Sequence, residues 1–141
     1  MRALALDVGS KTIGLAMTDE ARIAAHPLTV LSRVGHSGDA RAVAALVAEH
    51  GVVDVVVGMP FELSGKLGHR ARRVCEFVAV LRGQLPAGVQ LHEQDERFTT
   101  AEAERALIAT DMSRARRRGV IDQHAAALIL QAWLDAPRSR G

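Results

Sequence analysis

The sequence lacks the usual features of secreted and membrane proteins. It contains one cysteine, Cys75, so no intrachain disulfide can form, which is consistent with a reducing cytosol. No apolar run approaches the roughly 20 residues that a membrane-spanning helix needs. The first residues, MRALALDVG, show neither the basic region nor the small-residue cleavage site of a signal peptide. These absences predict a cytoplasmic protein that does not associate with membranes.

Internal repeats, low-complexity segments and linkers are also missing. The 141 residues are 48% hydrophobic and 24% charged, an ordinary globular balance that allows a substantial core. We therefore expect a single domain over residues 1–141. The histidines are scattered without zinc-ligand spacing, and the chain has no GxxxxGK[ST] phosphate loop.

Short apolar segments alternate with amphipathic ones along the chain. The turn-rich GSKTIG between two apolar runs predicts a hairpin, and VVDVVVG predicts a buried parallel strand. Three meandering strands followed by right-handed crossovers make an α/β domain with one mixed sheet and helices on its faces. The expected strands are residues 3–8, 13–19, 27–32, 52–58 and 88–94, and the expected helices are 39–50, 68–83, 99–108 and 120–135.

Helix boundaries follow from local signals. Asp39 is a plausible N-cap for the first helix, and Gly51 ends that helix. Residues 110–119, TDMSRARRRG, lack apolar periodicity and predict a mobile basic loop. In the last helix the expected inward stripe is Ala125, Leu128, Ile129, Ala132 and Trp133.

Carboxylates at predicted strand ends carry the functional signal. Asp7 interrupts an apolar strand, and burial of an isolated carboxylate costs several kcal/mol or more. Asp95 and Glu96 follow the fifth strand, and carboxyl ends of strands hold the sites of open α/β sheets. Asp122 has the spacing of the inward stripe in the last helix, although a capping role is an equal alternative for it.

Clustered acids must bind cations or be partly protonated, because like charges raise one another's pKa. All-oxygen ligands suit Mg²⁺ or Mn²⁺. Carboxylates that hold paired hard cations are the usual apparatus of phosphodiester cleavage. The interpretation is therefore that the partner of Asp7 is a metal ion.

The basic residues are concentrated in two stretches, HRARR and RARRR, although the net charge is only +2. Such stretches can bind phosphates or can be solvated faces. The candidates for gripping a nucleic-acid backbone are Arg70, Arg72, Arg73, Arg114, Arg116, Arg117 and Arg118.

Four motifs, DVGSKTIGLA, VVVGMP, DERFTT and VIDQHAAALILQAWLD, occur in an order that resembles a bacterial family. These proteins are the pre-16S ribosomal RNA nucleases, also described as Holliday junction resolvases of the YqgF/RuvX type. The resemblance covers nearly the whole chain. It implies an RNase H-like fold with a five-stranded sheet of order 3-2-1-4-5, whose first three strands are antiparallel. It also implies a metal-dependent nuclease that acts on RNA or on branched DNA.

The same resemblance implies roles for individual residues. Asp7, the acid of the DER motif and Asp122 would be the catalytic metal ligands. We favour Glu96 over Asp95, because the longer side chain reaches more easily past the intervening strand, although the inserted HEQ leaves the register open. The residues implied to contact or shape the nucleic-acid site are Lys11, Arg97, Thr99 and Thr100.

Several functions compete within and beyond this resemblance. Processing of the 5′ end of pre-16S rRNA ranks first, and Holliday junction resolution in recombination and repair is the alternative. A resolvase needs two sites in a symmetric dimer, and the sequence leaves monomer and homodimer open. A non-catalytic nucleic-acid-binding module is a further alternative. An actin-like ATPase fragment, suggested by DVGSKTIG, is disfavoured because such proteins clamp ATP between two domains.

Overall fold

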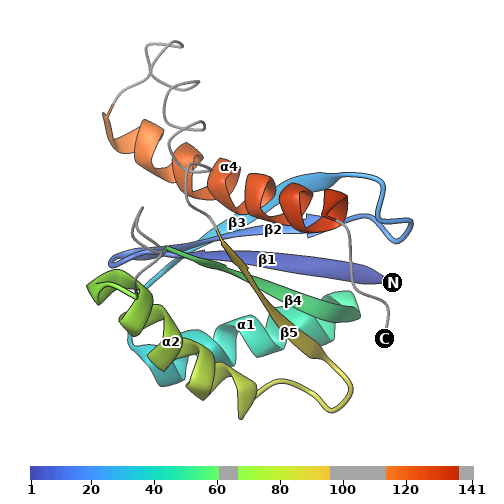
Figure 1. Ribbon diagram of the computed structural model, residues 1–141, viewed down its shortest axis with the longest axis horizontal. Helices are drawn as coiled ribbons and strands as arrows, with labels where there is room; N and C mark the ends of the chain where they lie inside the picture. The colour runs from blue at the N-terminus through green and yellow to red at the C-terminus, as the bar shows by residue number, and fades with distance from the viewer. Residues whose placement is uncertain (61–66, 96–113, 137–141) are drawn as a thin grey trace.

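The computed structural model describes residues 1–60, 67–95 and 114–136, with side chains described throughout these ranges except at 114–123. A five-stranded sheet with the order β3-β2-β1-β4-β5 forms the centre of the molecule (Figure 1). The strands are β1 (Arg2–Val8), β2 (Thr12–Thr18), β3 (Ala25–Ser32), β4 (Val52–Met59) and β5 (Gln90–Asp95). The helices are α1 (His36–His50), α2 (His69–Arg82) and α4 (Arg114–Asp135).

The pairing of the strands confirms the predicted fold class. β2 pairs antiparallel with both β1 and β3, whereas β4 pairs parallel with β1 and β5. The order 3-2-1-4-5 is therefore the one implied by the family resemblance. Gly51 ends α1 in the left-handed region, with φ 64°, as the sequence predicts.

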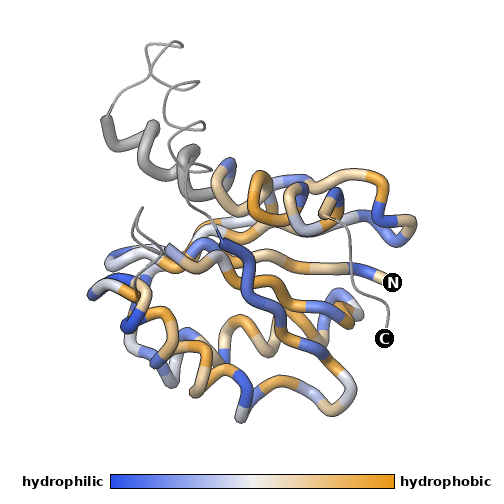
Figure 2. Tube along the Cα trace, in the orientation of Figure 1, coloured by the Kyte–Doolittle hydropathy of each residue, from blue (hydrophilic) through white to orange (hydrophobic). Residues whose placement is uncertain are grey.

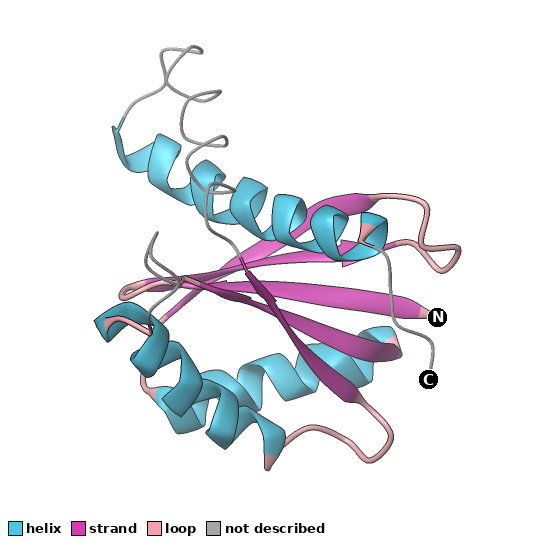
Figure 3. Cartoon of the chain, in the orientation of Figure 1, coloured by secondary structure: helices cyan, strands magenta, loops and turns pink. Residues whose placement is uncertain are grey.

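Helices cover the sheet on both faces, with α1 and α2 on one side and α4 on the other (Figures 1 and 3). Side chains of β1 alternate between these layers. Leu4, Leu6 and Val8 enter the larger core cluster with α1 and α2, while Ala3 and Ala5 pack against α4. Figure 2 shows the apolar β4 beside the more polar β5. In the part of the chain that the structure describes, no helix is long and apolar enough to cross a membrane.

The prediction that Asp39 caps α1 is wrong. The carbonyl of Gly35 accepts the first helical hydrogen bond, from the Asp39 amide at 2.9 Å, so Gly35 is the N-cap. Asp39 lies in the first turn and is 2% exposed. Its carboxylate accepts hydrogen bonds from Arg33 and from the backbone amide of Val34, which tie the end of β3 to α1.

The boundaries of α4 also differ from the prediction. The helix begins at Arg114 rather than at Val120, so residues 114–119 are helical and not a loop. Arginine and alanine are good helix formers, and this segment extends a helix whose later turns pack on the sheet, so it needs no apolar periodicity of its own. The predicted stripe is also rotated: the buried residues of the helix are Ala125, Ala126, Ile129, Leu130 and Trp133, while Leu128 and Ala132 are half-buried. The short helix expected over residues 99–108 lies outside the described residues.

Candidate functional site at the carboxyl end of β1

β1 carries Asp7 to the carboxyl end of the central strand. The residue is 7% exposed, among the few buried polar residues in the described part of the chain. Strand alternation gives it the parity of Ala3 and Ala5, which pack against α4. Asp7 therefore belongs to the α4 face of the sheet, at the edge where α/β folds place their sites.

Glycines flank Asp7 on the neighbouring strands. Gly14 of β2 is its register partner. On β4, Leu6 pairs with Val57, so the next position opposite Asp7 is Gly58. Neither neighbour adds a side chain to this row.

The turn between β1 and β2 is tight. The amide of Gly9 donates to the carbonyl of Thr12 at 2.8 Å. A Cβ atom at Gly9 would lie 3.0 Å from that carbonyl oxygen, so the turn requires glycine there. Lys11 is exposed on this turn, as a phosphate-contacting role requires.

Arg33, at the end of β3, holds the turn in place and was missed by the sequence analysis. Its Nη1 donates to the carbonyl of Gly9 at 2.6 Å, and its backbone amide donates to the carbonyl of Lys11 at 2.9 Å. Its Nε donates to Oδ2 of Asp39 at 2.6 Å, and its guanidinium lies 5.5 Å from the ring centroid of Phe77. An arginine directly after an apolar strand was the available signal, but its partners lie on three other segments.

Arg33 also sets the ionisation of Asp39. Burial by itself raises the pKa of Asp39. The hydrogen bonds from Arg33 and Val34, together with the positive charge of Arg33, outweigh burial and hold that pKa below 3.8. The carboxylate is therefore stabilised in its charged form beside the turn.

Asp95, the last residue of β5, pairs in register with Met59. Leu91 packs against the α1–α2 core cluster, whereas His92 contacts Trp133 of α4. Asp95 has the parity of Leu91 and so belongs to the face opposite Asp7. Gln94, paired with Gly58, belongs to the row of Asp7.

The structure does not bring the whole predicted metal site together. Asp122 lies in α4, four residues before the buried Ala126, but its side chain is outside the description. Among the side chains that are described, no three histidine, cysteine, aspartate or glutamate residues form a metal site. The predicted residues outside the described ranges are Glu96, Arg97, Thr99 and Thr100, and those in α4 without described side chains are Arg114, Arg116, Arg117 and Arg118. The other predicted arginines, Arg70, Arg72 and Arg73, are exposed on the first turns of α2.

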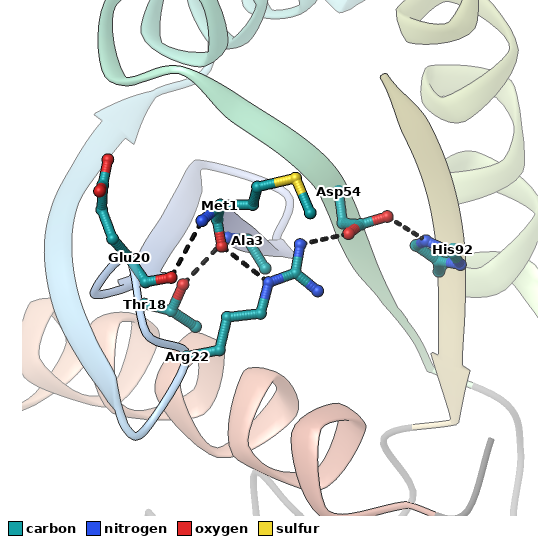
Figure 4. A network of polar contacts seen from close by, with 7 residues as sticks. All are labelled: Met1, Ala3, Thr18, Glu20, Arg22, Asp54 and His92. Carbon is teal, nitrogen blue, oxygen red and sulfur yellow. Dashed lines mark hydrogen bonds and ion pairs between the residues drawn. The ribbon is translucent and has the colours of Figure 1, made fainter. Parts of the chain in front are cut away.

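A second polar network lies at the opposite end of the strands (Figure 4). Asp54 of β4 accepts hydrogen bonds from Arg22 and from His92, the latter at 2.8 Å if that ring nitrogen is protonated. Arg22 and His92 both lie against Trp133, with 5.6 Å from the guanidinium to the ring centroid and 5.1 Å between ring centroids. The network thus joins the sheet to the end of α4, away from Asp7.

Burial raises the pKa of Asp54, but its hydrogen bonds with His92 and Arg22 and their charges outweigh burial and lower it below 3.8. Arg22 adopts a left-handed backbone conformation, with φ 57°, and its Nε also donates to the carbonyl of Met1 at 2.8 Å. The loop between β2 and β3 is therefore anchored to the first residue of the chain as well as to β4.

Solved structures share this arrangement of elements. The fowlpox virus resolvase in complex with Holliday junction DNA aligns with a TM-score of 0.61 and 10% identity, over 96% of this chain and 97% of that one. RuvC of T. thermophilus in complex with a Holliday junction substrate aligns with a TM-score of 0.54 and 18% identity, over 96% of both chains. The fold is therefore RNase H-like.

Sequence comparison narrows this class to one family. Residues 1–136 match the RuvX family, described as Holliday junction resolvase. A relative from Desulforudis audaxviator is 42% identical over 139 residues, with 99% of this chain and 97% of the relative covered. One from Myxococcus xanthus is 44% identical over 138 residues, with coverage of 98% and 90%. Both relatives carry the name "Putative pre-16S rRNA nuclease". The chain belongs to the RuvX family.

Proposed function

We propose that this protein is a metal-dependent nuclease that hydrolyses phosphodiester bonds during 5′-end processing of pre-16S rRNA. The names of its relatives indicate the reaction and the substrate. The structural observation that supports it best is the burial of Asp7 at the carboxyl end of β1, between Gly14 and the position of Gly58. A buried carboxylate whose register neighbours are glycines is suited to a cation.

Asp7, Glu96 and Asp122 are the proposed ligands of one or two Mg²⁺ or Mn²⁺ ions. We propose Glu96 rather than Asp95 because Asp95 has the parity of Leu91 and belongs to the face opposite Asp7. Helical periodicity supports Asp122, because positions 122, 126, 129 and 133 share one face of an α-helix. Ala126, Ile129 and Trp133 are the buried members of that face.

Carboxylate oxygens are the donors that Mg²⁺ and Mn²⁺ prefer. When bound, such a cation supplies electrostatic stabilisation of the charge that develops on the phosphate oxygens. The protein's own contribution is to hold Asp7 rigidly on the central strand, with the turn beside it fixed by Arg33. Lys11, Arg97 and the two basic stretches would hold the substrate backbone.

Incubation of the purified protein with Mn²⁺ and a substrate panel tests the proposal. The panel contains precursor 16S rRNA ends, single-stranded RNA, single-stranded DNA and four-way junctions. We expect cleavage of the rRNA precursor near its mature 5′ end, and loss of that cleavage when the metal is chelated. An intact precursor under conditions that cleave another member of the panel would contradict the rRNA assignment.

Holliday junction resolution is the second candidate function. The family description and the two junction-bound structural neighbours favour it. Resolution of a junction requires paired incisions, so a homodimer with two sites is expected. Symmetric nicking of a four-way junction by a species with the mass of a dimer would favour this candidate.

A further inference from the structure

A pocket of about 520 Å³ opens at the same sheet edge as Asp7, but on the opposite face. Val8, which follows Asp7, forms part of its lining and belongs to the α1–α2 core cluster. Gly9 and Ser10 of the β1–β2 turn also line it, so one peptide bond separates the pocket wall from Asp7.

The ionisable side chains that line this pocket are all basic among the residues that the structure describes. Arg33, His36, His69, Arg70 and Arg73 contribute to it, and no described carboxylate does.

The ion pairs made by residues of this lining leave two arginine charges available. Asp39 already pairs with Arg33, and the exposed Glu76 lies 3.8 Å from His36. Available positive charge therefore comes mainly from Arg70 and Arg73, which are both exposed. The pocket is built to receive an anion.

Backbone dipoles add to this charge. The pocket lies between the N-terminal turns of α1 and α2, and Gly35 and His69 of those turns are in its lining. Neither helix has a side-chain hydrogen bond at its N-cap, Gly35 or Gly68. Amides at such helix starts are available to a ligand, and each helix start carries about half a positive charge.

We propose that this pocket binds the terminal phosphate monoester of a nucleic-acid strand. Two arginines and two helix starts together suit a group with a charge of about −1.5 to −2 better than an internal phosphodiester with one charge. Val8 and Val74 supply apolar surface for the adjoining sugar. The strand then continues over the β1–β2 turn towards Asp7, which is the part of the inference that rests on the proposed nuclease function.

The experiment measures binding without cleavage. Fluorescence anisotropy in EDTA compares one RNA sequence with a 5′-phosphate, a 3′-phosphate or hydroxyl groups at both ends. We expect one phosphorylated form to bind about tenfold more tightly than the hydroxyl form, because charge-assisted hydrogen bonds are the strong ones. The preferred form identifies the polarity of the strand. Equal affinity for all three RNAs would overturn the proposal.

Variants assign the preference to the pocket. R70Q together with R73Q is expected to abolish it, whereas R41Q together with R82Q removes the same charge from exposed positions outside the lining and should retain it. All four positions are exposed, and a thermal unfolding curve checks that each double variant folds. If the R41Q, R82Q variant lost the preference for the phosphorylated end while the R70Q, R73Q variant kept it, the assignment to this pocket would be overturned.

Two further measurements distinguish a nucleic-acid end from a free mononucleotide, and the pocket proposal from the nuclease proposal. Adenosine monophosphate that competes fully, without any preference between RNA ends, would identify a free mononucleotide and overturn the strand assignment. Because binding is measured without metal, a retained end preference in a protein that cleaves nothing would leave the pocket standing while the nuclease proposal fails. Cleavage of RNA by a protein that shows no end preference would support the nuclease proposal and overturn the pocket proposal.

Discussion

At the scale of single residues, Asp7 and Arg33 explain most of the site's construction. A buried carboxylate in an apolar strand requires interactions that stabilise its charge, and its register neighbour on β2 is a glycine, Gly14. Arg33 acts indirectly on the site, because it joins the turn after Asp7 to the buried Asp39. One residue carries the proposed chemistry, and the other keeps its turn in place.

Asp7→Asn is expected to reduce cleavage more than about 100-fold, because the amide loses the charge that holds a cation. The substitution conserves volume, so folding and RNA binding should remain. Initial rates on labelled precursor RNA, thermal unfolding and anisotropy measure the three properties. Glu49→Gln, at an exposed position of α1, is the matched control. Retained turnover in Asp7→Asn would remove this residue from the catalytic set.

Arg33→Met is expected to lower the free energy of unfolding by about 3 kcal/mol, because it leaves the buried Asp39 carboxylate without its cation. Urea unfolding at pH 7 measures the loss. The double variant Arg33→Met with Asp39→Asn should recover part of it, since no buried charge then remains. Arg41→Met, on the exposed side of α1, should be near neutral. A double variant no more stable than Arg33→Met would argue against the ion pair as the cause.

At the scale of elements, α4 combines two roles along one helix. Its later turns pack Ala126, Ile129 and Trp133 on the sheet. Its first turns carry the RARRR stretch, for which the sequence pattern predicts a loop. Basic residues near a strand's backbone contribute to nucleic-acid affinity mainly through phosphate contacts.

Replacement of Arg116, Arg117 and Arg118 by glutamine is expected to weaken binding and flatten its dependence on salt. Each lost phosphate contact reduces the slope of log affinity against log salt by about 0.7 for a single strand, so the triple variant should lose about two units. Anisotropy across a salt series measures the slope. The Arg41→Gln, Arg82→Gln pair provides a control away from α4. An unchanged slope would exclude these arginines from the interface.

At the scale of the whole molecule, one end of the sheet holds the proposed functional site and the other end holds a stabilising polar network. The carboxyl end of β1 holds Asp7 and the basic pocket. The other end holds the network of Arg22, Asp54 and His92, which joins β4, β5 and α4. Because these two sites lie at opposite ends of the strands, the ion pair between Arg22 and Asp54 lies away from the proposed substrate path.

Stability should fall below about pH 4, because Asp39 and Asp54 both have pKa values held below the ordinary 3.8. Between the folded and unfolded pKa values the unfolded chain binds more protons, so acid favours unfolding. Asp54→Asn should therefore cost more stability at pH 7 than at pH 3. Urea unfolding of the variant and the wild type at both pH values checks the difference. An equal cost at both would show that the charge of Asp54 does not stabilise the fold.

Local sequence determined much of this protein. Alternating apolar segments specified the strands and most of the helices, since burial of apolar surface is required wherever the chain packs. Gly51 specified a helix end because few other residues tolerate its backbone conformation. Asp7 stood out because a carboxylate is expensive in an apolar strand. The family resemblance supplied the order of the strands.

Only the tertiary structure decided which distant residues meet. The face of Asp95 depends on the register of β5 against β4. The partners of Arg33 lie on the β1–β2 turn, on α1 and on α2, and the pocket exists only where α1, α2 and that turn converge. Such contacts join segments far apart in the chain, and their pairing follows from packing and register rather than from local residue preferences.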